Sequence, residues 1–116
     1  MTSVAFSLPL TPGKTEEWKE WGEEMLGARR SEYMASRQRL GVTIERGYLQ
    51  HTPMGDMAII YIETADIQGM FQGIAVSQDA FDVWFRERAK DLFSGLDLAA
   101  PPAYPPPMFV FDGGSR

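Results

Sequence analysis

Residues 42–63 read VTIERGYLQHTPMGDMAIIYIE, and this stretch decides the fold. Two runs rich in β-branched and aromatic residues, 42–51 and 56–63, enclose the turn-forming sequence Thr52-Pro53-Met54-Gly55. Runs of this composition on either side of a short Gly-containing loop are typical of a β-hairpin. The sequence therefore predicts two antiparallel strands joined by a tight loop.

The position of the loop fixes which residues face one another across the hairpin. The predicted pairs are His51 with Asp56, Leu49 with Ala58, Gly47 with Ile60 and Glu45 with Ile62. The opposite side carries Ile44, Arg46, Tyr48 and Gln50 together with Met57, Ile59, Tyr61 and Glu63. Neither side is simply polar, so the pattern leaves open which side meets the helices.

Toward the N-terminus, residues 4–8 alternate large and small side chains as a short strand does, and the Thr11-Pro12-Gly13 turn follows. The helical period then predicts one helix over 14–40, with acidic residues crowding its first half and basic residues its second. Its apolar stripe comprises Trp18, Trp21, Met25 and Ala28, and continues to Arg29, Glu32 or Tyr33, Ser36 and Leu40. Gly22 and Gly27 permit a bend, and Gly41 is placed to cap the helix.

Toward the C-terminus, a second helical region follows Asp66, a predicted N-cap, and Ser77 is predicted to cap its longer part. The stripe of that part is Phe81, Trp84, Phe85, Arg88, Leu92 and Leu96. A Pro-rich extended segment over 97–107 then leads into a predicted last strand, 108–111.

At 116 residues the chain is expected to be one domain, residues 1–112, followed by a mobile tail, 113–116. Its net charge of −5 excludes broad nucleic-acid binding, which needs clustered Lys and Arg. It contains no cysteine, which excludes disulfides, thiolate catalysis and Cys-rich zinc sites. No stretch has the roughly 20 apolar residues of a membrane span, and no export signal is evident, so we expect a cytoplasmic protein without a membrane partner.

The order strand, helix, strand, strand, helix, strand predicts an α+β fold of the ferredoxin-like βαββαβ kind. Its four-stranded antiparallel sheet would carry both helices on one face. Because the strands are apolar on both sides, the second face needs a cover, and a second copy packed sheet against sheet would supply it. Alternatively, the outward hydrophobic residues are ordinary protein surface.

Four segments carry a resemblance to a known family: Leu10-Thr11-Pro12-Gly13-Lys14, Arg29 to Glu32, Glu45 to Leu49, and Ser77-Gln78-Asp79-Ala80-Phe81. Together they resemble the dimeric α+β barrel superfamily, in particular small bacterial members of unassigned function. The resemblance implies a homodimer. It also brings relatives as different as cofactor-independent monooxygenases, lactone isomerases, sugar mutarotases, chlorite-dismutase-like haem proteins and stress-response proteins, so it favours no single activity.

The candidate site consists of polar residues that the pattern places among apolar ones. If the Glu45 face meets the helices, Glu45 would converge with Arg29 and Arg88 beside Tyr33 and Trp84. A buried carboxylate needs a partner such as a bidentate Arg, so these residues can form a structural ion pair. The same residues can instead bind a small organic ligand, anionic or aromatic, with Glu45 as a proton acceptor.

His51 is the only histidine and the natural general base, although an exposed ion pair with Asp56 is the alternative. With one His and no Cys, we expect no metal site, and haem would have only His51 as a nitrogen ligand; no cofactor is expected.

Two functions remain open. One is a dimeric barrel binding a small molecule in its helix–sheet cleft, including a cofactor-independent monooxygenase or isomerase; the other is a non-catalytic interaction module. A cleft cavity of about 300 Å³ or more would favour the first. Side chains that pair and fill the space would favour the second.

Overall fold

The hairpin predicted from residues 42–63 lies at the centre of the fold. A computed structural model describes residues 2–100, 104–111 and 113. Strands β2 (Val42–Thr52) and β3 (Gly55–Thr64) pair antiparallel. Their register sets His51 opposite Asp56, Leu49 opposite Ala58, Gly47 opposite Ile60 and Glu45 opposite Ile62. All four predicted pairs are confirmed.

Strand β1 (Thr2–Pro9) completes a three-stranded antiparallel sheet in the order β1–β3–β2. It pairs with β3 so that Val4 lies opposite Ile62 and Leu8 opposite Ala58. Because side chains alternate along each strand, the face of β1 that carries Val4 and Leu8 is the same face that carries Glu45 on β2.

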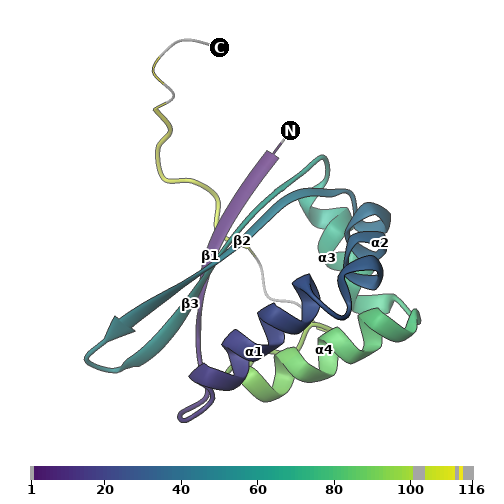
Figure 1. The fold of residues 1–116 in the computed structure, drawn as a ribbon. Coiled ribbons are helices and arrows are strands. Elements are labelled where there is room, and N and C mark those ends of the chain that lie inside the picture. The colour runs from purple at the N-terminus through teal and green to yellow at the C-terminus, as the bar shows by residue number, and fades with distance from the viewer. Residues whose placement is uncertain (1, 101–103, 112, 114–116) are drawn as a thin grey trace.

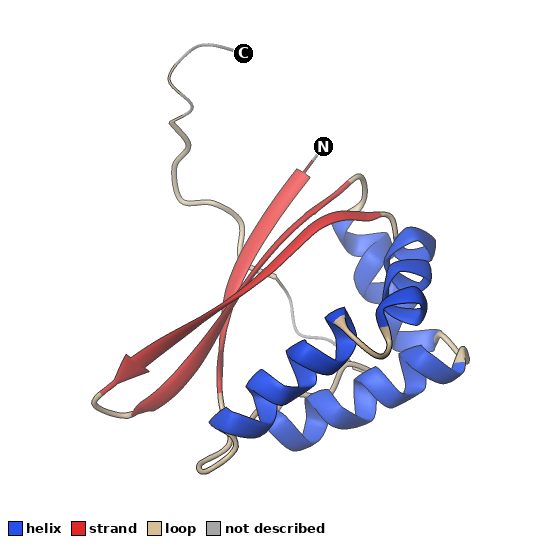
Figure 2. Cartoon of the chain, in the orientation of Figure 1, coloured by secondary structure: helices blue, strands red, loops and turns tan. Residues whose placement is uncertain are grey.

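Four helices lie on that one face of the sheet (Figures 1 and 2). They are α1 (Thr15–Leu26), α2 (Arg30–Leu40), α3 (Ile67–Val76) and α4 (Ala80–Leu92). The sheet face carrying Glu45 therefore meets the helices, and this resolves the ambiguity that the sequence left. The fold is α+β, but its order is β-α-α-β-β-α-α, and not the predicted βαββαβ. Within the described part of the chain, no helix is both long enough and apolar enough to cross a membrane.

The single helix predicted over 14–40 is wrong, because the chain breaks between Leu26 and Arg30. Gly27 adopts φ −112° and ψ −98°, outside the helical region, and a Cβ there would lie 2.9 Å from the carbonyl oxygen of Glu23. Of the predicted stripe, Ala28 is exposed, whereas Ser36 is buried as predicted. Arg37, which the predicted stripe did not include, is also buried.

The second helical region begins as predicted, since the Asp66 side chain accepts a hydrogen bond from the backbone N–H of Gly69 at the start of α3. The predicted cap at Ser77 is wrong. The N-cap of α4 is Asp79, whose carboxylate accepts from the N–H of Phe81. Ser77 ends α3, and its hydroxyl instead donates to the carboxylate of Asp82.

The predicted fourth strand does not form among the described residues, since 108–111 pair with no other strand. After α4 the chain bridges Leu10 at Phe93, and Pro105–Pro107 then share a recess with Thr2 and Ser3 of β1. Tyr104 still contacts the body of the molecule, because its ring stacks on Phe71 of α3 with the ring centres 5.8 Å apart. Residues 108–111 then stand clear of the sheet and the helices (Figure 1). The mobile tail predicted at 113–116 falls mostly outside the described residues.

Two groups of buried side chains hold the helices on the sheet. One joins α1, α4 and the β1 end through Leu10, Trp21, Ala58, Ala89, Leu92, Phe93 and Leu96. The other joins α3 to the sheet through Val4, Ile62, Ile67 and Met70. Most of the predicted α4 stripe is confirmed, but Arg88 lies at the surface and Ala89 takes the inward position.

Gly41 ends α2 in the left-handed conformation, with φ 75°, as the sequence predicted for a cap. Gly41→Ala should lower the free energy of unfolding by about 1 kcal/mol, because an L side chain is strained there. Gly22→Ala is the matched control: an added Cβ has no neighbour within 4 Å, and removing glycine from a helix should raise stability by about 0.5–1 kcal/mol. Urea unfolding of both variants measures the difference. If the two substitutions change the free energy of unfolding equally, the conformation of Gly41 does not strain an L side chain.

Candidate functional site

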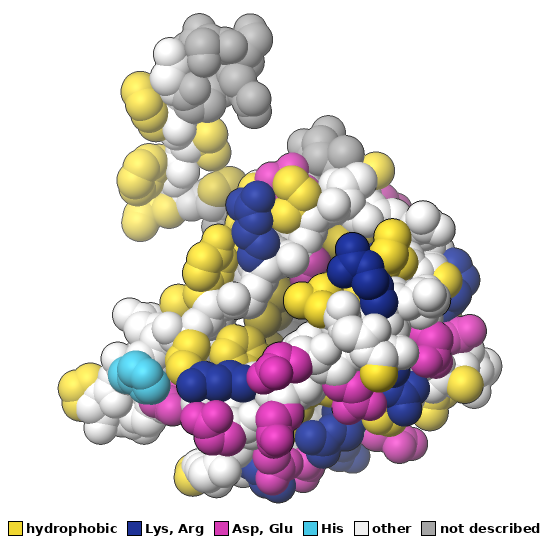
Figure 3. Space-filling model, viewed as in Figure 1, with side chains coloured by type: hydrophobic (Ala, Val, Ile, Leu, Met, Phe, Trp, Pro, Cys, Tyr) yellow, Lys and Arg dark blue, Asp and Glu magenta, His cyan; other side chains and the backbone are white. Residues whose placement is uncertain are grey.

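The space between the sheet and the helices holds a cavity of about 740 Å³. Its walls include residues from both buried groups, among them Trp21 and Phe93 of the first and Ile62 and Met70 of the second. Aromatic side chains contribute much of the lining: Phe6, Trp18, Trp21, Tyr33, Phe71, Phe85, Phe93 and Tyr104. In the space-filling view, hydrophobic side chains gather in a recess between the sheet and the helices, with charged side chains around it (Figure 3).

Glu45 of β2 lies in the wall of this cavity, and its partner is Arg37 of α2. Arg37 donates from Nε to Oε1 of Glu45 at 2.7 Å and from Nη2 to Oε2 at 3.2 Å. The Tyr33 hydroxyl donates to the same Oε1 at 2.7 Å. The side chains of Arg37 and Glu45 are only 11% and 19% exposed, so this is a nearly buried, bidentate ion pair.

The aromatic surroundings hold the guanidinium of Arg37 in place. Its Cζ lies 4.3 Å from the ring centre of Phe85 and 4.8 Å from that of Tyr33. A cation over an aromatic face is stabilised by the quadrupole of the ring. Arg37 is therefore fixed between Glu45 and two rings and is not free to bind another anion.

The pair changes the ionisation of its members. Burial on its own would raise the pKa of Glu45, but the charge and hydrogen bonds of Arg37, with the Tyr33 hydroxyl, hold that pKa below its usual range. Burial and the neighbouring carboxylate raise the pKa of the Tyr33 phenol well above its normal value. Glu45 is thus an ionised carboxylate and a weak base, and Tyr33 is a neutral donor.

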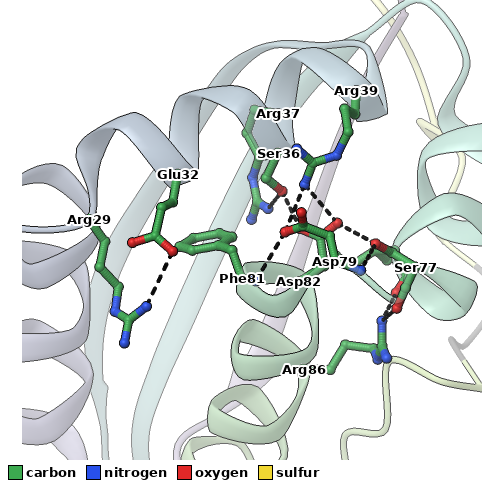
Figure 4. Close-up of polar contacts among 11 residues, drawn as sticks. Arg29, Glu32, Ser36, Arg37, Arg39, Ser77, Asp79, Phe81, Asp82 and Arg86 are labelled. Atoms are coloured by element: carbon green, nitrogen blue, oxygen red, sulfur yellow. Dashed lines mark hydrogen bonds and ion pairs between the residues drawn. The ribbon is translucent and has the colours of Figure 1, made fainter.

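A second polar cluster continues from Arg37 away from the cavity (Figure 4). Arg37 Nη1 donates to the hydroxyl of Ser36 at 3.0 Å, and that hydroxyl donates to Asp82 at 2.5 Å. Asp82 of α4 is 1% exposed and also accepts from Ser77 at 2.5 Å and from Arg39 at 3.1 Å. Burial opposes the ionisation of Asp82, yet these hydrogen bonds hold its pKa below the usual value. The cluster ties α2 to the start of α4.

Of the six predicted site residues, Glu45 and Tyr33 line the cavity together, and the other four do not. Arg29 pairs with Glu24 and Glu32 and stacks on Trp84, with its Cζ 4.1 Å from the ring centre. Arg88 forms ion pairs with Glu17 and Asp91 at the surface. The predicted convergence of Arg29 and Arg88 on Glu45 is therefore not seen.

His51 lies at the end of the hairpin, where its Nδ1 is 2.7 Å from Oδ1 of Asp56. Its side chain is 76% exposed and it does not line the cavity. This position agrees with the alternative predicted for His51, an exposed pair with Asp56.

The sequence did not lead to three polar groups of the site and its surroundings. These are the guanidinium of Arg37, the carboxylate of Asp82 that pairs with Ser36, and the indole N–H of Trp21. Arg37 stands four residues after Tyr33, on the same helix face, and this spacing was the available signal. The Nε1–H of Trp21 is the one buried side-chain polar atom of the described residues without a hydrogen-bond partner. Trp21 lines the cavity, but its Nε1 atom is itself buried and does not open onto the cavity space.

Comparison with protein-family models, curated proteins and solved structures found no match for this chain. Among the residues that the structure describes, no group of three or more His, Cys, Asp or Glu side chains is placed to hold a metal ion.

Proposed function

We propose that this chain is a dimeric binding protein that holds a small, largely apolar organic molecule in the helix–sheet cavity. The observation that carries the proposal is the cavity of about 740 Å³ with its predominantly aromatic and aliphatic lining. Ligand pockets in proteins typically measure about 300–1,000 Å³ and combine an apolar lining with a few polar groups.

The chemistry of the walls favours an uncharged ligand with aromatic or aliphatic character. Arg37 and Glu45 neutralise each other, so an anionic group finds no unpaired partner in this pair. Lys19 and Arg46 also line the cavity, but both are exposed and lie at its rim.

Binding is better supported than catalysis by Glu45. Both oxygens of Glu45 already accept hydrogen bonds from Arg37 or Tyr33, and its pKa is lowered. A general base needs a pKa near the working pH, and a carboxylate held this strongly is a poor one. We therefore assign the Glu45–Arg37 pair to the structure of the cavity wall.

The dimer is proposed because no helix of the described part of the chain covers the outer face of the sheet (Figure 2), and this face carries apolar side chains. Ile44, Met57, Ile59 and Tyr61 are half-buried there, and Tyr48 is 51% exposed. A sheet with apolar side chains on both faces is stabilised when the second face is also covered, and a second copy packed by two-fold symmetry covers both outer faces at once.

The uncharged dye N-phenyl-1-naphthylamine, which fluoresces in apolar surroundings, tests the cavity. Wild-type protein should bind it saturably. Ile60→Trp, which places a larger side chain in the cavity wall, should weaken binding about ten-fold or more, equivalent to about 1.4 kcal/mol. The control is Val76→Trp, because Val76 is 72% exposed and does not line the cavity. No saturable binding by wild-type protein, or equal binding by both variants, would reject the proposal.

A further inference from the structure

The C-terminal segment presents four successive apolar residues to water. Met108, Phe109, Val110 and Phe111 are 89%, 82%, 75% and 86% exposed. Their side chains stand out from the body of the molecule in the space-filling view (Figure 3). Contiguous exposed apolar residues mark interaction sites, and this composition strongly favours a β-strand. We call residues 108–111 the arm.

The path of the chain explains why the arm pairs with no strand among the residues that the structure describes. Phe93 bridges Leu10 at the C-terminal end of β1, and Ser94 donates to the carbonyl of Pro9. By Pro105–Pro107 the chain already shares a shallow recess with Thr2 and Ser3, the first described residues of β1. The chain has therefore travelled the whole length of β1 before the arm begins, and β1 offers the arm no further residues to pair with.

Strand β2 forms the edge of the sheet opposite β1, since the strand order is β1–β3–β2. No other strand of the described chain lies beyond it. An exposed edge strand is a template for pairing with another chain unless it is blocked. On its outer face β2 carries Ile44 and Tyr48, apolar side chains that a strand with alternating Phe109 and Phe111 can cover.

We propose that the arm of each chain adds to the β2 edge of a second copy, so that the two copies exchange arms reciprocally. This inference rests on the dimer proposed above and adds the arm and the β2 edge to the surfaces that join its two copies. Two-fold symmetry makes the exchange mutual, because the arm of each copy meets β2 of the other. The exchange covers the arm and the outer side of β2, two of the apolar features that the described part of the chain leaves exposed.

The absence of cysteine makes a direct test simple. One preparation carries Val110→Cys and the other Tyr48→Cys; the two are mixed and joined with a short bismaleimide. A covalent species of twice the 13.0 kDa chain mass is expected. The control replaces Tyr48→Cys with Met54→Cys, since Met54 is 98% exposed and would react more if cross-linking followed random collision. Cross-linking at Met54 equal to or above that at Tyr48 overturns the inference.

Sedimentation separates failure of the inference from failure of the dimer. Wild-type protein should sediment as a dimer, and the double variant Phe109→Asp/Phe111→Asp should raise the dimer dissociation constant at least about ten-fold, an effect of about 1.4 kcal/mol. Met54→Asp, an equally exposed change from an apolar to a charged residue, should not. A wild-type dimer that the arm variant leaves intact rejects arm exchange alone, whereas a wild-type monomer rejects the proposed dimer as well. Dye binding by the wild-type protein tests the cavity independently of both.

Discussion

Glu45→Gln should lower the free energy of unfolding by about 3 kcal/mol, because it leaves the Arg37 charge buried without its counter-ion. Arg37 is 11% exposed on its side chain and lies against the rings of Tyr33 and Phe85, so water reaches the guanidinium poorly. The amide that replaces the carboxylate still accepts a hydrogen bond but carries no charge. Chemical denaturation followed by circular dichroism measures the loss.

The matched control is Glu24→Gln, which removes a carboxylate from an equally short ion pair. Glu24 lies 2.8 Å from Arg29, but the two side chains are 44% and 32% exposed. An exposed pair contributes at most about 1 kcal/mol, because water and salt screen it. A loss at Glu45 no larger than the loss at Glu24 would show that the Glu45–Arg37 pair is not a buried interaction.

Lowering the pH should reduce the difference in unfolding free energy between the wild-type protein and Glu45→Gln. The pKa of Glu45 is lower in the folded chain than in the unfolded chain, where it is about 4.3. Ionised Glu45 therefore stabilises the fold fully when the pH is above this unfolded-state pKa. That contribution is lost as the pH falls through the lowered folded pKa. The variant lacks the group, and the two unfolding energies should therefore converge below about pH 4. If the difference in unfolding free energy stays constant at lower pH, the ionised form of Glu45 is not the cause of that difference.

The hairpin was predictable because its information is local. A four-residue loop and the two-residue period of a strand together fix the register, and a slip by one residue would turn Glu45 and Ile62 away from the helices. All four predicted pairs were correct for this reason. The same reasoning could not choose the inward face, since both faces carry apolar residues and the choice depends on how the helices pack.

The helices show where local reasoning fails. The backbone distortion at Gly27 separates α2 from α1, yet the stripe extended from Trp18 and Trp21 still reaches the inward residues Tyr33, Ser36 and Leu40. Its error is that it includes Arg29 and omits Arg37. A glycine in a helical pattern marks a place where a break is tolerated, but propensity alone does not say whether the break occurs. The prediction of the site inherited this error, because Arg29 was taken as the partner of Glu45.

The fourth strand failed for a different reason. Met108–Phe111 has the composition of a strand, and that prediction was sound as a local statement. A strand also needs a neighbour, and the number of residues between α4 and the arm carries the arm past β1. Composition records the preference of a segment, whereas the length of the connection decides which partner it can reach.

Asp82→Ala should lower the free energy of unfolding by about 3 kcal/mol, the second large effect that we expect. Asp82 is 1% exposed and accepts hydrogen bonds from Ser36, Ser77 and Arg39. Hydrogen bonds to a charged group contribute about 1.5–3 kcal/mol each, and removing their acceptor leaves buried donors unsatisfied. Ser36 is fully buried and has no access to water as a substitute.

The control that separates the effect of burial is Asp91→Ala, because Asp91 lies on the same helix, α4, but is exposed. Asp91 is 47% exposed and forms ion pairs with Lys14 and Arg88, so its removal should cost at most about 1 kcal/mol. Asp82→Asn should fall between the two, since it keeps an acceptor oxygen for one hydroxyl but loses the charge that Arg39 contacts. Thermal unfolding ranks the three variants. If Asp82→Ala is no more destabilising than Asp91→Ala, the cluster that joins α2 to the start of α4 does not stabilise the fold. The position of Arg37 then depends on its ion pair with Glu45 and on the aromatic rings.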